Sequence, residues 1–336
     1  MKATTLGYTP DENRYRRSHY RRCGASGLKL PALSLGLWYS FGDDFALDNQ
    51  RSIICRAFDL GINHFDLADK YGRPDGSAEE SFGRILRTEL AAHRDELLIS
   101  TKAGYPMWPG PYGGGASRKH LLAGLDQSLR RLGVDHVDVF YSHRPDPDTP
   151  IEETMLALST AARQGKIRYP AISSYSPEGT RHAAQILHEL GTPLLLHQPE
   201  YSMLNRGIER DLLDTVAELN IGCATFSPLA QGVLTGKYGD GVPDGSRAGQ
   251  GRSLSLQKVG DETLARVRAL RHVASRRGQS LAQLALSWAL RDDRITSVIM
   301  GVSSVQQLDE NFAAQKRAEF TDLELKEIDD CLSAPS

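Results

Sequence analysis

Cysteine is scarce in this sequence, and no two cysteines form a recognisable pair. The four that are present, Cys23, Cys55, Cys223 and Cys331, lie far apart, without a CxxC motif or a cysteine–histidine spacing typical of metal ligands. The sequence therefore indicates neither a disulfide framework nor a structural zinc site, and we expect no bound metal. We interpret the cysteines as the reduced thiols of a cytoplasmic protein.

Long apolar runs and an excess of one charge are also absent. No stretch approaches the roughly 20 consecutive apolar residues that a membrane-spanning helix needs, and the basic N-terminal segment lacks the apolar core of a signal peptide. The 40 basic and 42 acidic residues give a formal net charge of −2. We therefore expect neither a nucleic acid nor a membrane as a partner.

The chain does contain a regular alternation of short apolar runs with amphipathic stretches of helical period. Residues 1–18 are polar and aperiodic and predict a loosely held tail. Residues 19–32, with a turn at Gly24–Gly27, predict a β-hairpin. Strands are expected at 32–38, 63–66, 97–102, 137–143, 167–173, 194–198, 221–227 and 297–301. Helices are expected at 48–60, 78–92, 118–132, 151–164, 177–190, 207–219, 261–277 and 304–315, with two further ones at 280–291 and 321–332.

Eight strands alternating with eight helices predict an α/β protein, a (β/α)8 TIM barrel with an N-terminal β-hairpin and extra helices. A doubly wound sheet is the alternative, but no Gly-x-Gly-x-x-Gly motif follows the first strand. No repeat or low-complexity linker divides the chain, so we expect residues 1–336 to form one domain.

Local motifs mark several ends of these helices. Capping boxes are predicted at Ser77–Glu80 and Thr149–Glu152. Glycines at C′ positions are expected to end four helices: Gly61, Gly133, Gly165 and Gly191. The longest aperiodic stretch, 236–258, is rich in Gly, Ser and Arg, and we interpret it as a functional or mobile loop.

Polar side chains stand at successive strand ends, which meet at one mouth in a barrel of this kind. The second strand ends in Asp66 and leads to Tyr71, the third ends in Lys102, and the fourth ends in His143. Each taken alone is most simply a capping, solvated or scaffold residue. Four such residues at neighbouring strand ends favour a shared site.

This set suits the reduction of a carbonyl group. Tyr71 is expected to act as the general acid, with the Lys102 ammonium stabilising its phenolate. Asp66 is expected to hold Lys102 charged and in place. His143 can donate a hydrogen bond to a carbonyl oxygen. Because no side chain donates hydride, such a reaction requires a nicotinamide cofactor.

With these residues in place, the sequence resembles the aldo-keto reductase superfamily, and within it the group of bacterial L-glyceraldehyde 3-phosphate reductases and potassium-channel β-subunits. The resemblance extends from Tyr20 to about Cys331. The segments that carry it are Pro31–Trp38, Ser100–Tyr112, Tyr141–Arg144, Ser227–Gly232, Leu234–Tyr238 and Gly301–Asn311.

The resemblance implies a catalytic tetrad of Asp66, Tyr71, Lys102 and His143. It also implies NADP(H) as the cofactor, bound across the mouth. Channel β-subunits commonly have Asn at the fourth tetrad position, so His143 favours an enzyme. The cofactor-binding residues that we expect are Trp38, Asp66, Ser173, Ser174, Gln198, Tyr201, Ser227, Pro228, Leu229, Ala230, Gln231, Gly232, Lys237, Arg247, Gly301, Ser303, Gln307, Glu310 and Asn311.

Within this set, Gln198 is expected to contact the carboxamide and Tyr201 to stack beneath the nicotinamide ring. The 227–232 segment is expected to face the pyrophosphate with its backbone amides. The helix that begins near Ser303 is expected to offer its N-terminus to a phosphate.

The implied substrates are small aldehydes such as L-glyceraldehyde 3-phosphate and methylglyoxal. Four basic residues are candidates for a substrate phosphate: Lys70, Arg73, Arg118 and Arg144. By analogy we expect a homo-oligomer. A redox-sensing regulatory subunit is the alternative function. A metal-dependent barrel hydrolase using His64, His143 and His197 is a weaker reading, because the strands lack a clear His-x-His pair.

The sequence departs from the family pattern in the fifth strand. Pro170 stands where an apolar residue is usual, and Ala171 stands where glycine is usual. Because proline removes a ladder N–H inside a closed barrel, we predict a bulge there, which would displace Ser173 and Ser174.

Overall fold

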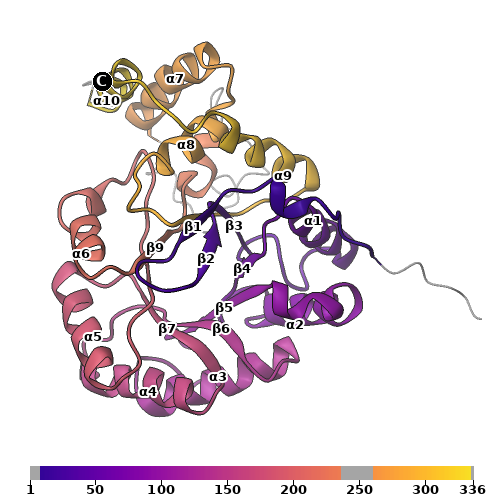
Figure 1. Ribbon diagram of the computed structural model, residues 1–336, viewed down its shortest axis with the longest axis vertical. Coiled ribbons are helices and arrows are strands. Elements are labelled where there is room, and N and C mark those ends of the chain that lie inside the picture. Colours follow the sequence, from indigo (N-terminus) through magenta and orange to yellow (C-terminus); the bar gives the residue numbers. More distant parts are fainter. Residues whose placement is uncertain (1–7, 236–259, 334–336) are drawn as a thin grey trace, which may run out of the picture.

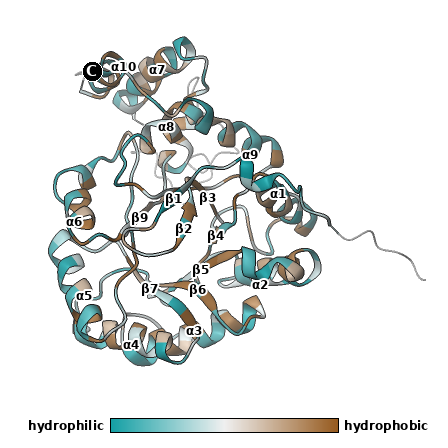
Figure 2. Cartoon of the chain, in the orientation of Figure 1, coloured by the Kyte–Doolittle hydropathy of each residue, from teal (hydrophilic) through white to brown (hydrophobic). Residues whose placement is uncertain are grey.

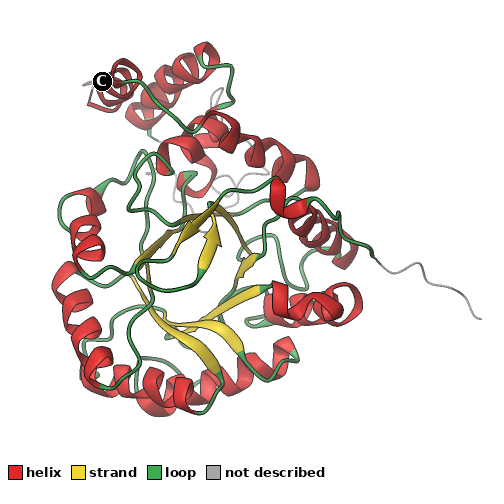
Figure 3. Cartoon of the chain, viewed as in Figure 1, coloured by secondary structure: helices red, strands yellow, loops and turns green. Residues whose placement is uncertain are grey.

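The structure is a computed structural model, and it describes residues 8–235 and 260–333. Eight parallel strands close into a barrel in the order β10-β3-β4-β5-β6-β7-β8-β9, which confirms the predicted (β/α)8 fold (Figure 3). These strands are β3 (Leu33–Gly36), β4 (His64–Asp66), β5 (Leu98–Ala103), β6 (Val137–Ser142), β7 (Ile167–Ser173), β8 (Leu196–Gln198), β9 (Gly222–Thr225) and β10 (Ser297–Met300).

Helices surround the barrel, and α7 and α10 lie together outside this ring (Figure 1). The helices are α1 (Leu47–Asp59), α2 (Ser77–Ile85), α3 (Arg118–Leu132), α4 (Ile151–Arg163), α5 (Pro177–Glu189), α6 (Leu212–Glu218), α7 (Asp261–Arg276), α8 (Leu281–Ala289), α9 (Val305–Phe312) and α10 (Asp322–Ser333). Within the described ranges, no helix is long and apolar enough to cross a membrane.

The predicted hairpin is formed by β1 (Tyr20–Arg22) and β2 (Lys29–Pro31), which pair antiparallel. It lies across the N-terminal end of the barrel, because Cys23 and Leu30 pack with Leu98 and Leu195, which stand where strands begin. The hairpin thus closes one end of the barrel and leaves the other end for a site.

Side chains alternate along each strand between two hydrophobic layers. In β5, Leu98 belongs to the cluster inside the barrel, whereas Ile99 and Ala103 pack in the layer between the barrel and the helices. The hydropathy colouring shows the apolar side of the helices against the strands (Figure 2). By the same alternation, Ser100 and Lys102 face the barrel interior.

The tail prediction is wrong for the described part of residues 1–18. Tyr8 donates from its hydroxyl to the Cys55 carbonyl at 2.9 Å and to Asp59 at 2.7 Å. Arg14 forms an ion pair with Glu96 at 2.5 Å. These isolated contacts hold the segment against α1 and against the 3-10 helix Ala91–Glu96, although the segment has no periodicity from which they could be predicted.

The predicted bulge at Pro170 is also wrong. Pro170 pairs with Phe140, and Ala171 with Tyr141, without interruption. The Pro170 carbonyl accepts from Leu195 N–H at 3.1 Å, so its nitrogen faces the β8 side. Pairing with β8 begins only at Ala171 and Leu196, so the missing N–H falls before β8 starts and costs no ladder bond.

Both predicted capping boxes are wrong as well. Ser77 lies inside α2 after the N-cap Gly76, and α4 follows Pro150, with no side-chain cap at either helix. The four predicted C′ glycines do adopt positive φ, between 68° and 81°.

Candidate active site

The centre of the barrel mouth is a buried ion pair at the ends of β4 and β5. Lys102 Nζ lies 2.6 Å from Asp66 Oδ2 and donates to the Leu67 carbonyl at 2.7 Å. It also donates to the Tyr71 hydroxyl at 3.4 Å. Lys102 and Asp66 are 0% and 2% exposed, so both charges are removed from water and depend on each other. The structure thus brings together three of the four predicted catalytic residues.

The other Asp66 oxygen is held by neutral donors. Ser100 Oγ donates to Asp66 Oδ1 at 2.7 Å, and Gln198 Nε2 donates to the same oxygen at 3.0 Å. With these two bonds and the one from Lys102, the carboxylate orientation is fixed from three sides.

Behind Ser100, a buried hydrogen-bonded chain continues through His64. His64 Nε2 lies 3.0 Å from Ser100 Oγ, and His64 Nδ1 lies 2.8 Å from Ser34 Oγ. Because Ser100 gives its proton to Asp66, it must accept from His64, so the proton of His64 is on Nε2. Burial lowers the pKa of His64 to about 4, which keeps the ring neutral.

His143 follows β6 and lies beside Tyr71, with ring centroids 6.0 Å apart. On its other side the Tyr105 ring stands edge-on at 4.6 Å. His143 Nδ1 is buried and has no hydrogen-bond partner among the described residues. All four predicted catalytic side chains therefore meet at one place.

Burial sets the protonation states of these groups. It raises the pKa of Tyr71 well above 10, and the Asp66 carboxylate adds to this effect. Burial lowers the pKa of Lys102, against the opposing effect of Asp66. Burial also lowers the pKa of His143 well below 6.5, with smaller contributions from Lys102 and Arg144. At neutral pH, Tyr71 thus keeps its proton and His143 is neutral.

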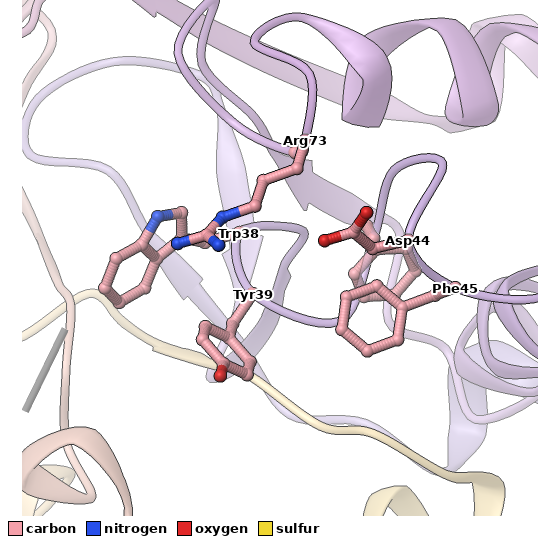
Figure 4. A pocket seen from close by; sticks show the side chains of 7 residues that line it. Trp38, Tyr39, Asp44, Phe45 and Arg73 are labelled. Atoms are coloured by element: carbon pink, nitrogen blue, oxygen red, sulfur yellow. The ribbon is translucent and has the colours of Figure 1, made fainter. Parts of the chain in front are cut away.

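An aromatic pocket of about 80 Å³ adjoins the tetrad. It is formed by the loop after β3 and the loop after Tyr71, and Figure 4 shows its labelled side chains, Trp38, Tyr39, Asp44, Phe45 and Arg73. The Trp38 ring is 40% exposed and lies 6.4 Å from the Tyr71 ring. Trp38 therefore forms one wall of the mouth, where the sequence predicted it.

Two expected cofactor residues after β7 differ in exposure. Ser173 is buried and donates to the Gln198 carbonyl at 2.8 Å, whereas Ser174 is exposed and has a φ of 61°. Gln198 is 1% exposed, and its amide already donates to Asp66. The three residues share the rim between β7 and β8, as expected from their strand ends.

The segment after β9 has an unusual backbone. Ser227, Ala230 and Gln231 adopt positive φ of 57°, 46° and 57°, and Gly232 has a φ of 101°. Left-handed conformations of residues other than glycine are strained and cluster at ligand sites. Pro228 and Leu229 are buried between them and anchor the segment.

The segment after β10 is exposed at Gly301, where an added Cβ would meet nothing within 4 Å. α9 begins at Val305, with Ser304 as its N-cap accepting from Gln307 N–H at 3.2 Å. Ser303 instead binds the Gln307 side chain at 2.9 Å. Glu310 is exposed and Asn311 is buried on the same helix.

The stacking role expected for Tyr201 is wrong. Its ring is buried and stacks on Trp288 at 5.2 Å, and its hydroxyl donates to Glu209 at 2.5 Å. The sequence missed Phe226, which directly follows β9, is partly exposed and belongs to neither described core cluster. An aromatic residue immediately before the 227–232 segment was the signal that could have identified it. Lys237 and Arg247 lie outside the described residues.

Of the three histidines considered as metal ligands, His64 and His197 form hydrogen bonds within the protein, and His143 lies with the tetrad. His64 binds two serine hydroxyls, and His197 Nε2 accepts from Tyr175 N–H at 3.3 Å. Over residues 8–235 and 260–333, no three His, Cys, Asp or Glu side chains are grouped so that they could hold a metal ion.

Asp69, two residues before Tyr71, is a buried carboxyl near the tetrad, and its backbone N–H donates to the Lys102 carbonyl at 3.0 Å. Asp69 is 0% exposed, and neither of its oxygens has a hydrogen-bond partner among the described residues. Burial, together with the Glu79 carboxylate, raises the pKa of Asp69 to about 8. Asp69 therefore keeps a proton at neutral pH.

Comparison with known proteins agrees with this geometry. Residues 32–333 match the model of the Aldo/keto reductase family. A protein named L-glyceraldehyde 3-phosphate reductase from Escherichia coli is 56% identical over 321 residues, covering 94% of this chain and 93% of the relative. The matched region includes all four tetrad residues.

Potassium-channel subunits are also similar. A probable voltage-gated potassium channel subunit beta from Arabidopsis thaliana is 39% identical, covering 88% of this chain and 90% of the relative. A putative one from Schizosaccharomyces pombe is 38% identical, covering 94% and 93%. The family match over nearly the whole chain and the identity of these relatives show that this protein belongs to the aldo/keto reductase family, a family of oxidoreductases.

Proposed function

We propose that this protein reduces small aldehydes and ketones to alcohols with NADPH, with L-glyceraldehyde 3-phosphate and methylglyoxal as substrates. The observation that carries the proposal is the Lys102 ammonium, buried between the Asp66 carboxylate at 2.6 Å and the Tyr71 hydroxyl at 3.4 Å. The name of the relative from Escherichia coli supports the choice of L-glyceraldehyde 3-phosphate.

Tyr71 is the proposed proton donor. Lys102 Nζ donates its hydrogen bond to the phenol oxygen, so the phenol O–H points elsewhere and is free to be donated to a carbonyl oxygen. The raised pKa keeps Tyr71 protonated before the reaction. As the phenolate develops, the nearby ammonium lowers the cost of releasing the proton.

His143 is proposed to orient the carbonyl. Its neutral imidazole has one N–H donor, and its ring lies next to the Tyr71 ring. A hydrogen bond from this ring to the carbonyl oxygen would fix the substrate and stabilise the negative charge that develops on oxygen.

The residues around the mouth fit a nicotinamide dinucleotide. Positive φ at Ser227, Ala230 and Gln231 gives the segment after β9 a strained backbone of the kind found at ligand sites, and the open space at Gly301 leaves room for a phosphate near α9. We propose that the 227–232 segment, Ser303 and Gln307 hold the phosphates, Gln198, Ser173 and Ser174 hold the carboxamide, and Phe226 takes the stacking role. When bound, the nicotinamide supplies the hydride.

A substrate panel tests this function. NADPH and NADH oxidation is measured with L-glyceraldehyde 3-phosphate, L-glyceraldehyde and methylglyoxal, and we expect turnover with NADPH on at least the phosphorylated aldehyde. Negligible turnover with every substrate, together with tight NADPH binding, would instead support the alternative, a redox-sensing regulatory subunit similar to the channel subunits. The single domain, the homo-oligomer and the cytoplasmic location stay predictions.

A further inference from the structure

We propose that Arg144, held over the Tyr105 ring beside His143, is the residue that receives the substrate's terminal phosphate and makes the enzyme selective for phosphorylated aldehydes. This inference rests on the proposed reductase function. Arg144 is one of the four basic candidates named from the sequence, with Lys70, Arg73 and Arg118.

Two of the candidates are already engaged elsewhere. Lys70 Nζ lies 2.5 Å from Asp75 and donates to the Pro106 carbonyl at 2.7 Å. Arg118 donates to Thr160 Oγ1 at 2.6 Å and to the Leu156 carbonyl at 3.3 Å, which turns it toward α4. Neither cation is available to a small ligand in the mouth.

Arg144 is exposed, and its position is nevertheless defined. Its Cζ lies 4.4 Å from the centroid of the Tyr105 ring, and its carbonyl accepts from Ser142 Oγ at 3.3 Å. The Tyr105 ring in turn stands 4.6 Å from the His143 ring. Gly104 permits this approach, because an added Cβ there would come within 3.3 Å of the His143 Cβ. A guanidinium held on an aromatic face loses less freedom when it binds an anion.

A structural ion pair does not account for Arg144. The nearby carboxylate is that of Asp146, which accepts from Ala116 N–H at 2.7 Å, from Thr149 Oγ1 at 2.7 Å and from Asp148 N–H at 3.1 Å. Among the described residues, no carboxylate lies within ion-pair distance of Arg144. Its guanidinium is therefore exposed and unpaired by a carboxylate, and such a planar fork can bind a phosphate in a bidentate way.

Arg144 is separated from the tetrad by one aromatic ring, which suits a short substrate. Arg144 and His143 both pack on the Tyr105 ring, with the Arg144 Cζ 4.4 Å and the His143 ring centroid 4.6 Å from its centroid. In L-glyceraldehyde 3-phosphate, four bonds separate the carbonyl carbon from phosphorus. A substrate whose oxygen meets Tyr71 and His143 can thus extend past Tyr105 to the guanidinium. Methylglyoxal has no group that reaches Arg144.

The test compares kcat/KM for L-glyceraldehyde 3-phosphate and for L-glyceraldehyde, which lacks only the phosphate. Because charge-assisted bidentate bonds are strong, Arg144→Gln is expected to lower the first value by about 10- to 100-fold and the second by less than about twofold. Arg144→Lys keeps the charge without the fork, and a loss of about three- to tenfold is expected. Tyr105→Phe keeps the aromatic face under the guanidinium and should preserve the ratio of the two kcat/KM values. Tyr105→Leu also removes the ring that packs against His143, so it should lower both values, and the value for the phosphorylated aldehyde more.

Arg73 is the matched comparison, since it is also exposed at the mouth but lines the Trp38 pocket. A selective loss in Arg73→Gln instead of Arg144→Gln would overturn the proposal, and so would equal losses on both substrates in Arg144→Gln. A second readout does not need turnover: calorimetric binding of glycerol 3-phosphate and of glycerol in the presence of NADP. If wild-type protein turns over neither aldehyde, the reductase function fails, while loss of glycerol 3-phosphate binding in Arg144→Gln still supports the anion site. Unchanged binding in that variant refutes the site.

Discussion

Replacing Asp66 by Asn perturbs the centre of the proposed mechanism with little change in volume. The variant removes the charge that faces Lys102 at 2.6 Å, while Ser100 and Gln198 can still bind the amide oxygen. Burial already lowers the pKa of Lys102, and Asp66 is the largest opposing influence. Without the carboxylate, the pKa of Lys102 falls further, and the lysine loses its proton at a lower pH.

Lys102 and Asp66 are 0% and 2% exposed, so removal of one partner leaves the other charge buried and lowers the free energy of unfolding. Breaking a buried pair costs about 3–5 kcal/mol. For a chain of 336 residues the entropy of unfolding is about 0.7 kcal/mol per kelvin, so Tm falls by roughly 4–7 °C. In the variant, the pKa of Lys102 is lower in the folded state than in the unfolded state, so at alkaline pH the unfolded state binds more protons. Its stability therefore rises with pH, and the Tm difference from wild type narrows at alkaline pH.

The assay is the pH dependence of kcat/KM, combined with calorimetric Tm. In Asp66→Asn, the alkaline limb of kcat/KM is expected to move to lower pH as the Lys102 ammonium is lost. Glu209→Gln is the control, because it breaks a partly buried pair with Arg291, at 2.8 Å, that involves no tetrad residue. The control should lower Tm and leave the alkaline limb in place. An unchanged alkaline limb and an unchanged Tm in Asp66→Asn would show that Asp66 does not keep Lys102 charged.

Three further predictions concern other residues of the barrel and its loops. Asp69→Asn is expected to raise Tm, with a gain that grows from about pH 4 to about pH 8 and is constant above, because the folded carboxyl has a pKa of about 8 and the unfolded one ionises near 4; a gain independent of pH in calorimetry would contradict this. Tyr201→Phe should lower the free energy of unfolding by about 1–2 kcal/mol, because the hydroxyl loses its bond to Glu209, and should not weaken NADPH binding. Phe226→Ala should weaken NADPH binding in a fluorescence titration. Weaker binding in Tyr201→Phe and unchanged binding in Phe226→Ala would restore the stacking role of Tyr201. Pro170→Ala should change the free energy of unfolding by less than about 1 kcal/mol in urea, because no ladder bond is missing there; a clear gain would show a hidden strain.

Much of the fold was predictable because period and strand ends are strong signals. The run 167–173 coincides with β7, and the helix pattern at 118–132 coincides with α3. The tetrad followed from one geometric rule, that the carboxyl ends of parallel strands share a mouth. This rule needs only the strand ends, and Asp66, Lys102 and His143 mark three of them.

The errors arose where an outcome depends on a partner distant in the sequence. Ser77 and Thr149 match the capping pattern but form no capping box, whereas Ser280 and Gln283 do form one. The proline at 170 is tolerated because β8 begins one residue later. Asp69 is buried because α3 approaches it, with Gly124 placed so that an added Cβ would lie 3.7 Å from Asp69 Oδ2. None of these conditions is visible in local sequence.

The proposed function depends on Tyr71 donating the proton in a carbonyl reduction. The most direct measurement compares wild type with Tyr71→Phe for NADPH oxidation on L-glyceraldehyde 3-phosphate and for NADPH binding by fluorescence. Within residues 8–235 and 260–333, the Tyr71 hydroxyl accepts one hydrogen bond, from Lys102, so its removal should leave the fold and NADPH binding intact. We predict that turnover falls by at least about 100-fold while the NADPH Kd changes less than about threefold. Turnover close to that of wild type would contradict the account.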